Sequence, residues 1–133
     1  MAIRVNLLDR ADALLAEAAG ARDPADRFRA AYLAALRGAG AALAGRTART
    51  GSRSAWTLLA RVEPDLAGWA EFFASHSETR AAIEAGISRT ITVGEANRFH
   101  FEVSRFLTVV EDRLRELGAP GTLVGDGLAR RSA

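Results

Sequence analysis

Apolar residues recur every three or four positions along most of the chain, a spacing typical of amphipathic helices. The first such stretch covers about residues 3–19, and Gly20 is expected to end it. The second helix begins with Asp23 as N-cap and Pro24 in its first turn, and it runs to about Ala44.

The next two predicted helices are separated by a proline. Ser54 is expected to cap a short third helix, and Pro64 begins the fourth. Helix propensity falls around Ser75-His76-Ser77, where Ser75-x-x-Glu78 has the spacing of a capping box. The fourth helix is therefore expected to bend or restart at this point.

The fifth helix has the clearest boundaries. Thr92-x-x-Glu95 predicts a capping box, and the helix should run to about Leu117. Its apolar seam alternates four- and three-residue steps, as helices of a bundle do. The seam consists of Ala96, His100, Val103, Leu107, Val110, Leu114 and Leu117. Phe101 lies off this seam and predicts a second contact surface.

Aromatic residues are concentrated in residues 54–74, which contain both tryptophans and two of the six phenylalanines. Such side chains bury the most area, so this stretch should form the centre of the core. β-Branched residues are scarce and good helix formers abundant, which favours an all-α fold. We predict a single-domain antiparallel bundle of four or five helices over residues 1–118, followed by a flexible tail over residues 119–133.

Composition excludes several kinds of chemistry. The chain contains neither Cys nor Lys, so thiolate nucleophiles, thiolate metal sites, Walker-type phosphate loops and lysine Schiff bases are absent. We predict no cofactor, no metal site and no catalytic residue. The pI lies above 10 although the net charge is only +2, because Arg supplies all of the strongly basic side chains.

The cellular compartment is predicted from the apolar runs of the sequence. No apolar run is long enough to span a membrane, and charged side chains such as Asp9 and Asp12 interrupt the first apolar stretch, unlike a secretory leader. We therefore expect a cytoplasmic protein with no membrane contact.

Arg46, Arg49 and Arg53 form a basic segment without acids that ends at Ser54. Guanidinium groups next to a helix N-terminus suit a phosphate, so these four residues are candidate phosphate ligands. The alternative is a solvated loop, since three charges are few for nucleic-acid binding.

His76, Arg80 and His100 are further candidates. His76 and Arg80 lie one turn apart on an apolar stripe, so they either reach a surface or dimer interface or line a polar pocket. His100 lies within the seam of the fifth helix, either as a packed core residue or as an acid–base group in a cleft.

Two helical charge pairs at i,i+4 spacing are expected to be structural. They join Arg98 to Glu102 and Glu111 to Arg115.

Three segments together resemble a bacterial branch of the HEPN superfamily (higher eukaryotes and prokaryotes nucleotide-binding), over about residues 5–115. They are A-x-Y-L-A-A-L-R in the second helix, W-x-L-L-A-R-V-x-P-x-L-x-x-W-A-x-F-F-A over residues 56–74, and T-x-x-E-A at the start of the fifth helix. The resemblance implies a compact helical bundle that is frequently a homodimer.

Many members of the superfamily are metal-independent RNases, often toxins, with an Arg-x(4–6)-His motif. Neither His76 nor His100 has an Arg at that spacing, so no catalytic role transfers to this chain. The resemblance then implies a non-catalytic module that binds RNA or a nucleotide. Two alternatives stay open: a protein-interaction module of adaptor or antitoxin type, and an RNase with a rearranged active site.

Overall fold

The computed structural model describes residues 2–44, 54–87 and 91–117, and all regular structure in them is helical, which confirms the predicted all-α class. The elements are α1 (Ala2–Gly20), α2 (Pro24–Leu43), α3 (Ala55–Val62), the 3₁₀ turn η1 (Pro64–Leu66), α4 (Ala67–Ala74), α5 (Ser77–Glu84) and α6 (Val93–Leu117). The predicted boundary at residue 118 and the tail lie outside the described residues.

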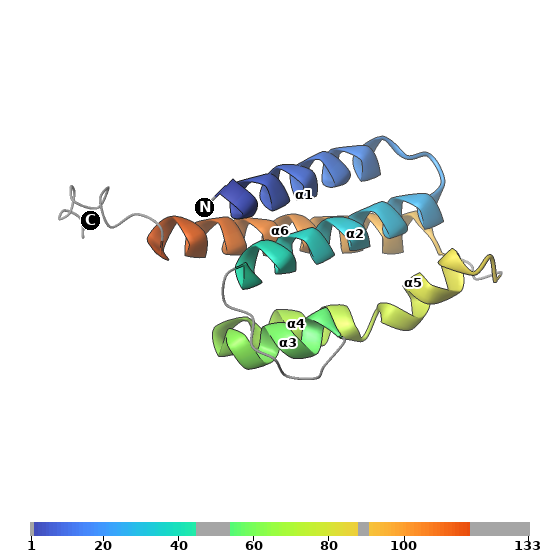
Figure 1. Ribbon diagram of the computed structural model, residues 1–133. Helices are drawn as coiled ribbons and strands as arrows, with labels where there is room; N and C mark the ends of the chain where they lie inside the picture. The colour runs from blue at the N-terminus through green and yellow to red at the C-terminus, as the bar shows by residue number, and fades with distance from the viewer. Residues whose placement is uncertain (1, 45–53, 88–90, 118–133) are drawn as a thin grey trace.

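α1, α2 and α6 lie side by side, and α2 is the central helix of the fold (Figure 1). α2 runs antiparallel to α1, as expected (Figure 1). α6 instead runs parallel to α2. Two contacts show this direction: near the start of α2, Phe28 packs on Phe99 with ring centroids 4.2 Å apart, and further along α2, Gly38 lies against Leu107. α3, α4 and α5 lead the chain back to the end of the bundle at which α2 begins, so α6 starts at that end too.

α3 and α4 form an antiparallel hairpin beside α2 and α6 (Figure 1). Trp56 at the start of α3 stacks on Phe73 at the end of α4, with centroids 4.9 Å apart. Trp69 contacts Phe106 of α6 at 5.5 Å. The start of α3 therefore lies close to the α4–α5 junction.

Three predicted helix starts are confirmed. The Asp23 carboxylate accepts a hydrogen bond from the Asp26 amide at 3.2 Å, and the Ser54 hydroxyl accepts one from the Thr57 amide at 3.3 Å. The capping box of α6 is reciprocal: the Thr92 amide donates to Glu95 Oε1 at 2.9 Å, and the Glu95 amide donates to Thr92 Oγ1 at 3.0 Å.

The predicted restart after α4 is confirmed, but the capping box at Ser75 is wrong. Ser75 is the C-cap of α4 and keeps helical backbone angles, and its hydroxyl donates to the Phe72 carbonyl at 2.6 Å rather than accepting from the Glu78 amide. His76 occupies the N-cap position of α5 without a side-chain cap bond. The chain thus turns at His76, and this turn carries a candidate site residue.

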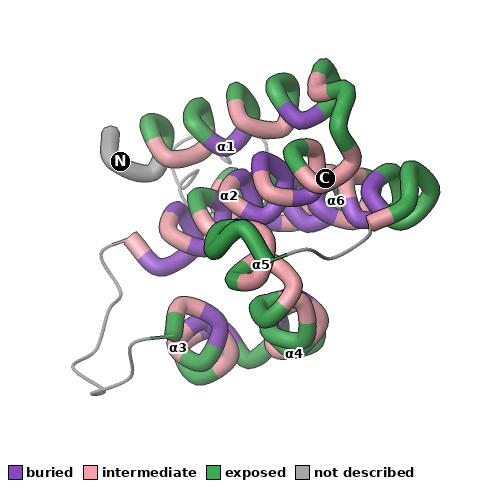
Figure 2. The backbone as a smooth tube through the Cα atoms, turned by 90° about the vertical axis from the view of Figure 1, so that its right-hand side faces the viewer, coloured by how far each residue is buried: buried purple, intermediate pink, exposed green. Residues whose placement is uncertain are grey.

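The core is an aromatic network that joins α2, α3, α4 and α6. It includes every aromatic residue of the chain except Phe101: Phe28, Tyr32, Trp56, Trp69, Phe72, Phe73, Phe99 and Phe106. Residues 54–74 contribute four of these side chains. Phe101 is 60% exposed, which confirms that it faces away from the seam. Buried positions face inward in α1, α2 and α6, whereas α5 has none (Figure 2).

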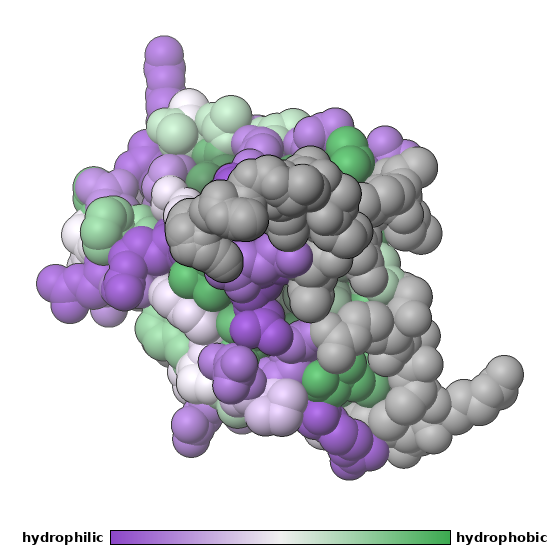
Figure 3. Space-filling view, turned by 90° about the vertical axis from the view of Figure 1, so that its left-hand side faces the viewer, coloured by the Kyte–Doolittle hydropathy of each residue, from purple (hydrophilic) through white to green (hydrophobic). Residues whose placement is uncertain are grey.

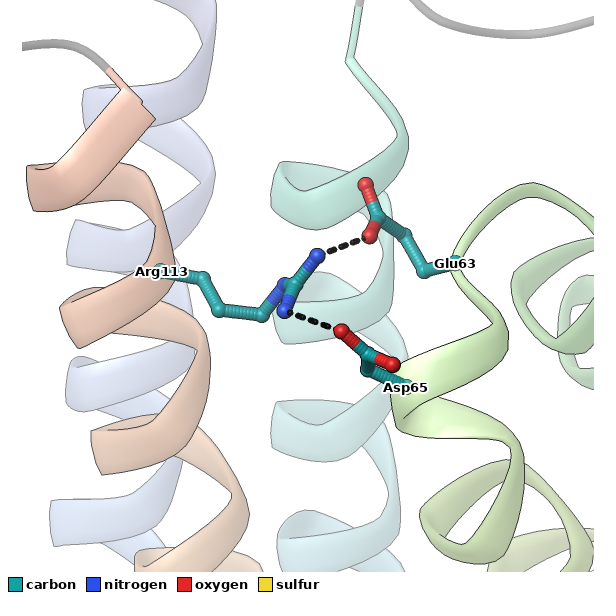
Figure 4. Close-up of polar contacts among 3 residues, drawn as sticks. All are labelled: Glu63, Asp65 and Arg113. Atoms are coloured by element: carbon teal, nitrogen blue, oxygen red, sulfur yellow. Dashed lines mark hydrogen bonds and ion pairs between the residues drawn. The ribbon is translucent and has the colours of Figure 1, made fainter.

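Arg113 of α6 reaches across to the segment between α3 and α4. It donates to the buried Glu63 carboxylate and, at 3.3 Å, to the exposed Asp65 (Figure 4). Nearby, Arg115 pairs with Asp112 at 2.9 Å rather than with Glu111, so that predicted pair is wrong. The i,i+3 carboxylate lies within reach on the same helix face.

At the end where α1 begins and α6 ends, described hydrophobic side chains appear only as separate patches among hydrophilic ones (Figure 3). Among the described helices, none is long and apolar enough to cross a membrane.

Candidate functional site

A pocket of about 450 Å³ lies where α2 begins, α4 meets α5 and α6 begins. Each of these elements supplies part of its wall. Its lining residues are Phe28, Phe72, His76, Thr79, Ile91, Thr92, Gly94, Glu95, Arg98, Phe99 and Glu102. The volume falls in the usual range for small-molecule sites, which is about 300–1,000 Å³.

The apolar part of the pocket is a set of near-parallel aromatic rings. Phe99 stacks on Phe28 at 4.2 Å with 24° between the planes, and on Phe72 at 6.2 Å with 21°. Phe28 and Phe99 are buried, whereas Phe72 is half-buried and offers the most open ring. A planar aromatic ligand could stack here, as nucleobases do on protein side chains.

The acidic and arginine side chains that line the pocket lie on one stripe of α6. Glu95, Arg98, Phe99 and Glu102 follow i, i+3, i+4 and i+7 spacing, so they share a helix face. Glu95 is held by its capping bond, and Glu102 pairs with Arg105 at 3.0 Å.

The predicted Arg98–Glu102 pair is therefore wrong, because Arg105, one turn further on, occupies this carboxylate. Within the described part of the chain, Arg98 has no carboxylate at ion-pair distance. Its exposed guanidinium at the pocket is available to a ligand.

His76 lies in the pocket wall. Its ring packs on Phe72 at 4.6 Å and on Phe99 at 5.0 Å. Nδ1 lies 2.8 Å from the Phe72 carbonyl oxygen, which can only accept, so Nδ1 carries a hydrogen. In the neutral ring Nε2 is then a hydrogen-bond acceptor.

Arg80 lies next to the pocket but does not line it. Its guanidinium carbon is 5.5 Å from the centroid of the Tyr32 ring, and its Nε is 3.6 Å from Glu84. Nε is buried and makes no hydrogen bond, while a third of the side chain is exposed. Arg80 is thus anchored by a cation–π contact and a neighbouring carboxylate.

His100 lies in a different place, a smaller pocket of about 220 Å³ among α1, α2 and α6. Its Nε2 donates to the Leu15 carbonyl at 3.1 Å. Arg27, in the same pocket, donates to the carbonyls of Ala18 and Ala21 and to the Asn97 side chain. Both side chains are engaged in joining helices, which fits the prediction of a packed histidine.

Arg46, Arg49 and Arg53 lie outside the described residues. Ser54 is described, and its hydroxyl caps α3. Trp56, two residues after Ser54, stacks on Phe73 near the end of α4. The Ser54 cap therefore lies near the α4–α5 junction, where His76 is located. Among the described residues, no group of three or more His, Asp or Glu side chains could hold a metal ion.

Of the residues that line this site, sequence reasoning singled out His76 as a candidate, but it missed Arg98 and the aromatic wall. The signal was present as Glu95-x-x-Arg98-Phe99-x-x-Glu102, an i, i+3, i+4, i+7 stripe with alternating charge around an aromatic residue. The partners on α2 and α4 depend on tertiary packing, which no local spacing reveals.

The fold and the pocket together define a small all-helical domain with an aromatic-walled pocket. The family model of the SAV_6107-like HEPN domain matches residues 18–111, more than two thirds of the chain. The chain belongs to this family, and the match includes every residue that lines the pocket. Neither the curated proteins nor the solved structures contain a match to the chain.

Proposed function

We propose that the protein is a non-catalytic HEPN module that binds RNA or a nucleotide, and that its pocket receives one base. The observation that carries this proposal is the stack of Phe28, Phe72 and Phe99 beside the available guanidinium of Arg98. The rings provide a stacking surface, and Arg98 provides a donor for a phosphate or a base edge. Membership of a nucleotide-binding superfamily supports the same function.

Further arginines are candidates for the same binding path. Arg80 lies one turn from His76, and Ser54 marks the end of the basic segment with Arg46, Arg49 and Arg53. In this proposal the four arginines contact phosphates of the same strand, and His76 contributes to the wall. We propose that the protein performs this role in the cytoplasm.

A gel shift with labelled single-stranded RNA at several salt concentrations tests the proposal. We expect a shift that weakens steeply with salt, since each phosphate contact releases counterions. Arg98→Gln should weaken binding about three- to tenfold, whereas Arg37→Gln, an exposed arginine of α2 outside the pocket, should not. A probe that stays free at low salt overturns the proposal, and a shortened probe favours the RNase alternative.

A second function, protein interaction, is favoured by one observation. Phe101 is 60% exposed on α6 and takes no part in the aromatic network. We propose that it contacts a second copy of the chain in a homodimer, consistent with the dimers common in the superfamily. Association that is insensitive to salt and independent of RNA would support this function.

A further inference from the structure

The carboxylate of Glu102 is held in a fixed position at one end of the pocket. Its Oε1 accepts from Arg105 Nη1 at 3.0 Å, and the guanidinium carbon of Arg105 lies 5.5 Å from the centroid of the Trp69 ring. Only 26% of the Glu102 side chain is exposed. Arg105 is thus a positioning residue that orients a half-buried acceptor group beside the aromatic wall.

Glu95 is less suited to contact a ligand. Its side chain is exposed, so water competes with a ligand for both carboxylate oxygens, and Oε1 also accepts the capping bond from the Thr92 amide. Removing that bond for a ligand would leave the first turn of α6 without its cap. Of the two carboxylates, Glu102 is therefore the one positioned to read a bound molecule.

An ionised carboxylate only accepts hydrogen bonds, so it selects a ligand edge that carries donors. Guanine presents two adjacent donors, N1–H and the exocyclic amino group, which match the two oxygens of one carboxylate. In Glu102, Oε1 can accept one of them beside Arg105 Nη1, because each carboxylate oxygen has two lone pairs. Adenine and cytosine place a ring nitrogen acceptor beside their amino group, and that acceptor would face the second oxygen. Uracil offers a single N–H between two carbonyls, which the carboxylate repels.

We infer that the pocket selects guanine, with Glu102 accepting from N1–H and the amino group while the base stacks against Phe72. This inference rests on the proposed function, because it concerns the same pocket. The surroundings of Glu102 are consistent with a bound guanine. Arg98, four residues before Glu102 on the same stripe, can donate to the guanine carbonyl or the phosphate. The preference arises from hydrogen bonding, so it should survive high salt better than the phosphate contacts do.

Competition against a labelled single-stranded RNA of mixed sequence tests this inference. GMP should displace the RNA at a concentration about tenfold lower than AMP, CMP or UMP, as expected for a bidentate base contact. IMP, which keeps N1–H but lacks the amino group, should be intermediate. Glu102→Gln should remove most of the GMP preference, whereas Glu111→Gln, an exposed acid on the same helix outside the pocket, should leave it unchanged.

The outcomes separate the inference from the proposed function. Equal competition by all four mononucleotides, or a preference for another base, overturns guanine selection and leaves RNA binding intact. Absence of any RNA binding overturns the proposed function and the inference with it. The comparison of GMP with IMP uses only the unaltered protein, so it decides the question even if Glu102→Gln is unstable.

Discussion

Trp56 donates a hydrogen bond from its indole Nε1 to the Tyr32 hydroxyl at 2.8 Å, and both side chains are buried. The bond joins α3 to α2 in the aromatic core. An indole nitrogen can only donate, so the loss of its acceptor leaves a buried donor without a partner. We expect Tyr32→Phe to lower the free energy of unfolding by about 1–3 kcal/mol.

Urea unfolding followed by tryptophan fluorescence measures this effect. The double variant Tyr32→Phe/Trp56→Phe is the control, because it removes the donor together with the acceptor. An unchanged urea midpoint for Tyr32→Phe would show that this hydrogen bond contributes nothing to stability.

Gly38 and Gly40 provide a matched pair on α2. A Cβ on Gly38 would clash with the buried Leu107 Cδ2, whereas a Cβ on Gly40 would meet Leu7 at 3.5 Å, an ordinary contact. Alanine is the better helix former by about 1 kcal/mol. We therefore expect Gly40→Ala to stabilise the protein, and Gly38→Ala to be less stable than Gly40→Ala by at least about 1 kcal/mol.

Thermal melting of the two variants decides this prediction. Equal melting temperatures would mean that α2 and α6 do not approach as closely at Gly38 as the structure shows.

Arg113 pairs with one buried and one exposed carboxylate (Figure 4). Glu63 is 3% exposed, so removal of the Arg113 charge leaves a buried anion with less compensation. We expect Arg113→Gln to cost about 2–4 kcal/mol in unfolding free energy. Asp65→Asn, at a side chain that is 81% exposed, should cost less than about 1 kcal/mol. Similar effects in chemical denaturation for both variants would contradict this difference.

Much of the fold could be predicted from local sequence. Capping residues such as Asp23, Ser54 and Thr92 act on their own turns, so their spacing identified the helix starts. The capping box at Ser75 failed because its hydroxyl bonds backwards to the Phe72 carbonyl, which a residue pattern does not distinguish. The parallel course of α2 and α6 depends on long-range packing and had no local signal.

The candidate site was less accessible to sequence reasoning for the same reason. Isolated residues such as His76 could be singled out, but the pocket combines side chains of α2, α4, α5 and α6. Its aromatic wall requires Phe28 and Phe99 to meet, and they lie far apart in the sequence. The charge pairs in the structure also differ from the predicted ones. Both Arg98 and Arg105 are spaced to pair with Glu102, and only the three-dimensional arrangement shows that Arg105 does so.

Phe101 tests the proposed homodimer. Burial of a phenylalanine against a partner contributes about 1.5–3 kcal/mol, so Phe101→Ser should raise the dimer dissociation constant at least about tenfold. Light scattering after size-exclusion chromatography measures the mass of each species. A monomeric wild-type protein, or a dimer unaffected by Phe101→Ser, would contradict the assignment of this residue to the interface.

Chemical-shift mapping by NMR tests most directly whether the pocket is the ligand site. Titration of ¹⁵N-labelled protein with single-stranded RNA should shift the amide signals of His76, Thr79, Gly94 and Arg98, which surround the pocket. Signals from the outer face of α1, such as Asp12 and Ala16, should stay in place. Shifts confined to other parts of the molecule, or no shifts at RNA concentrations that saturate the gel, would contradict the account.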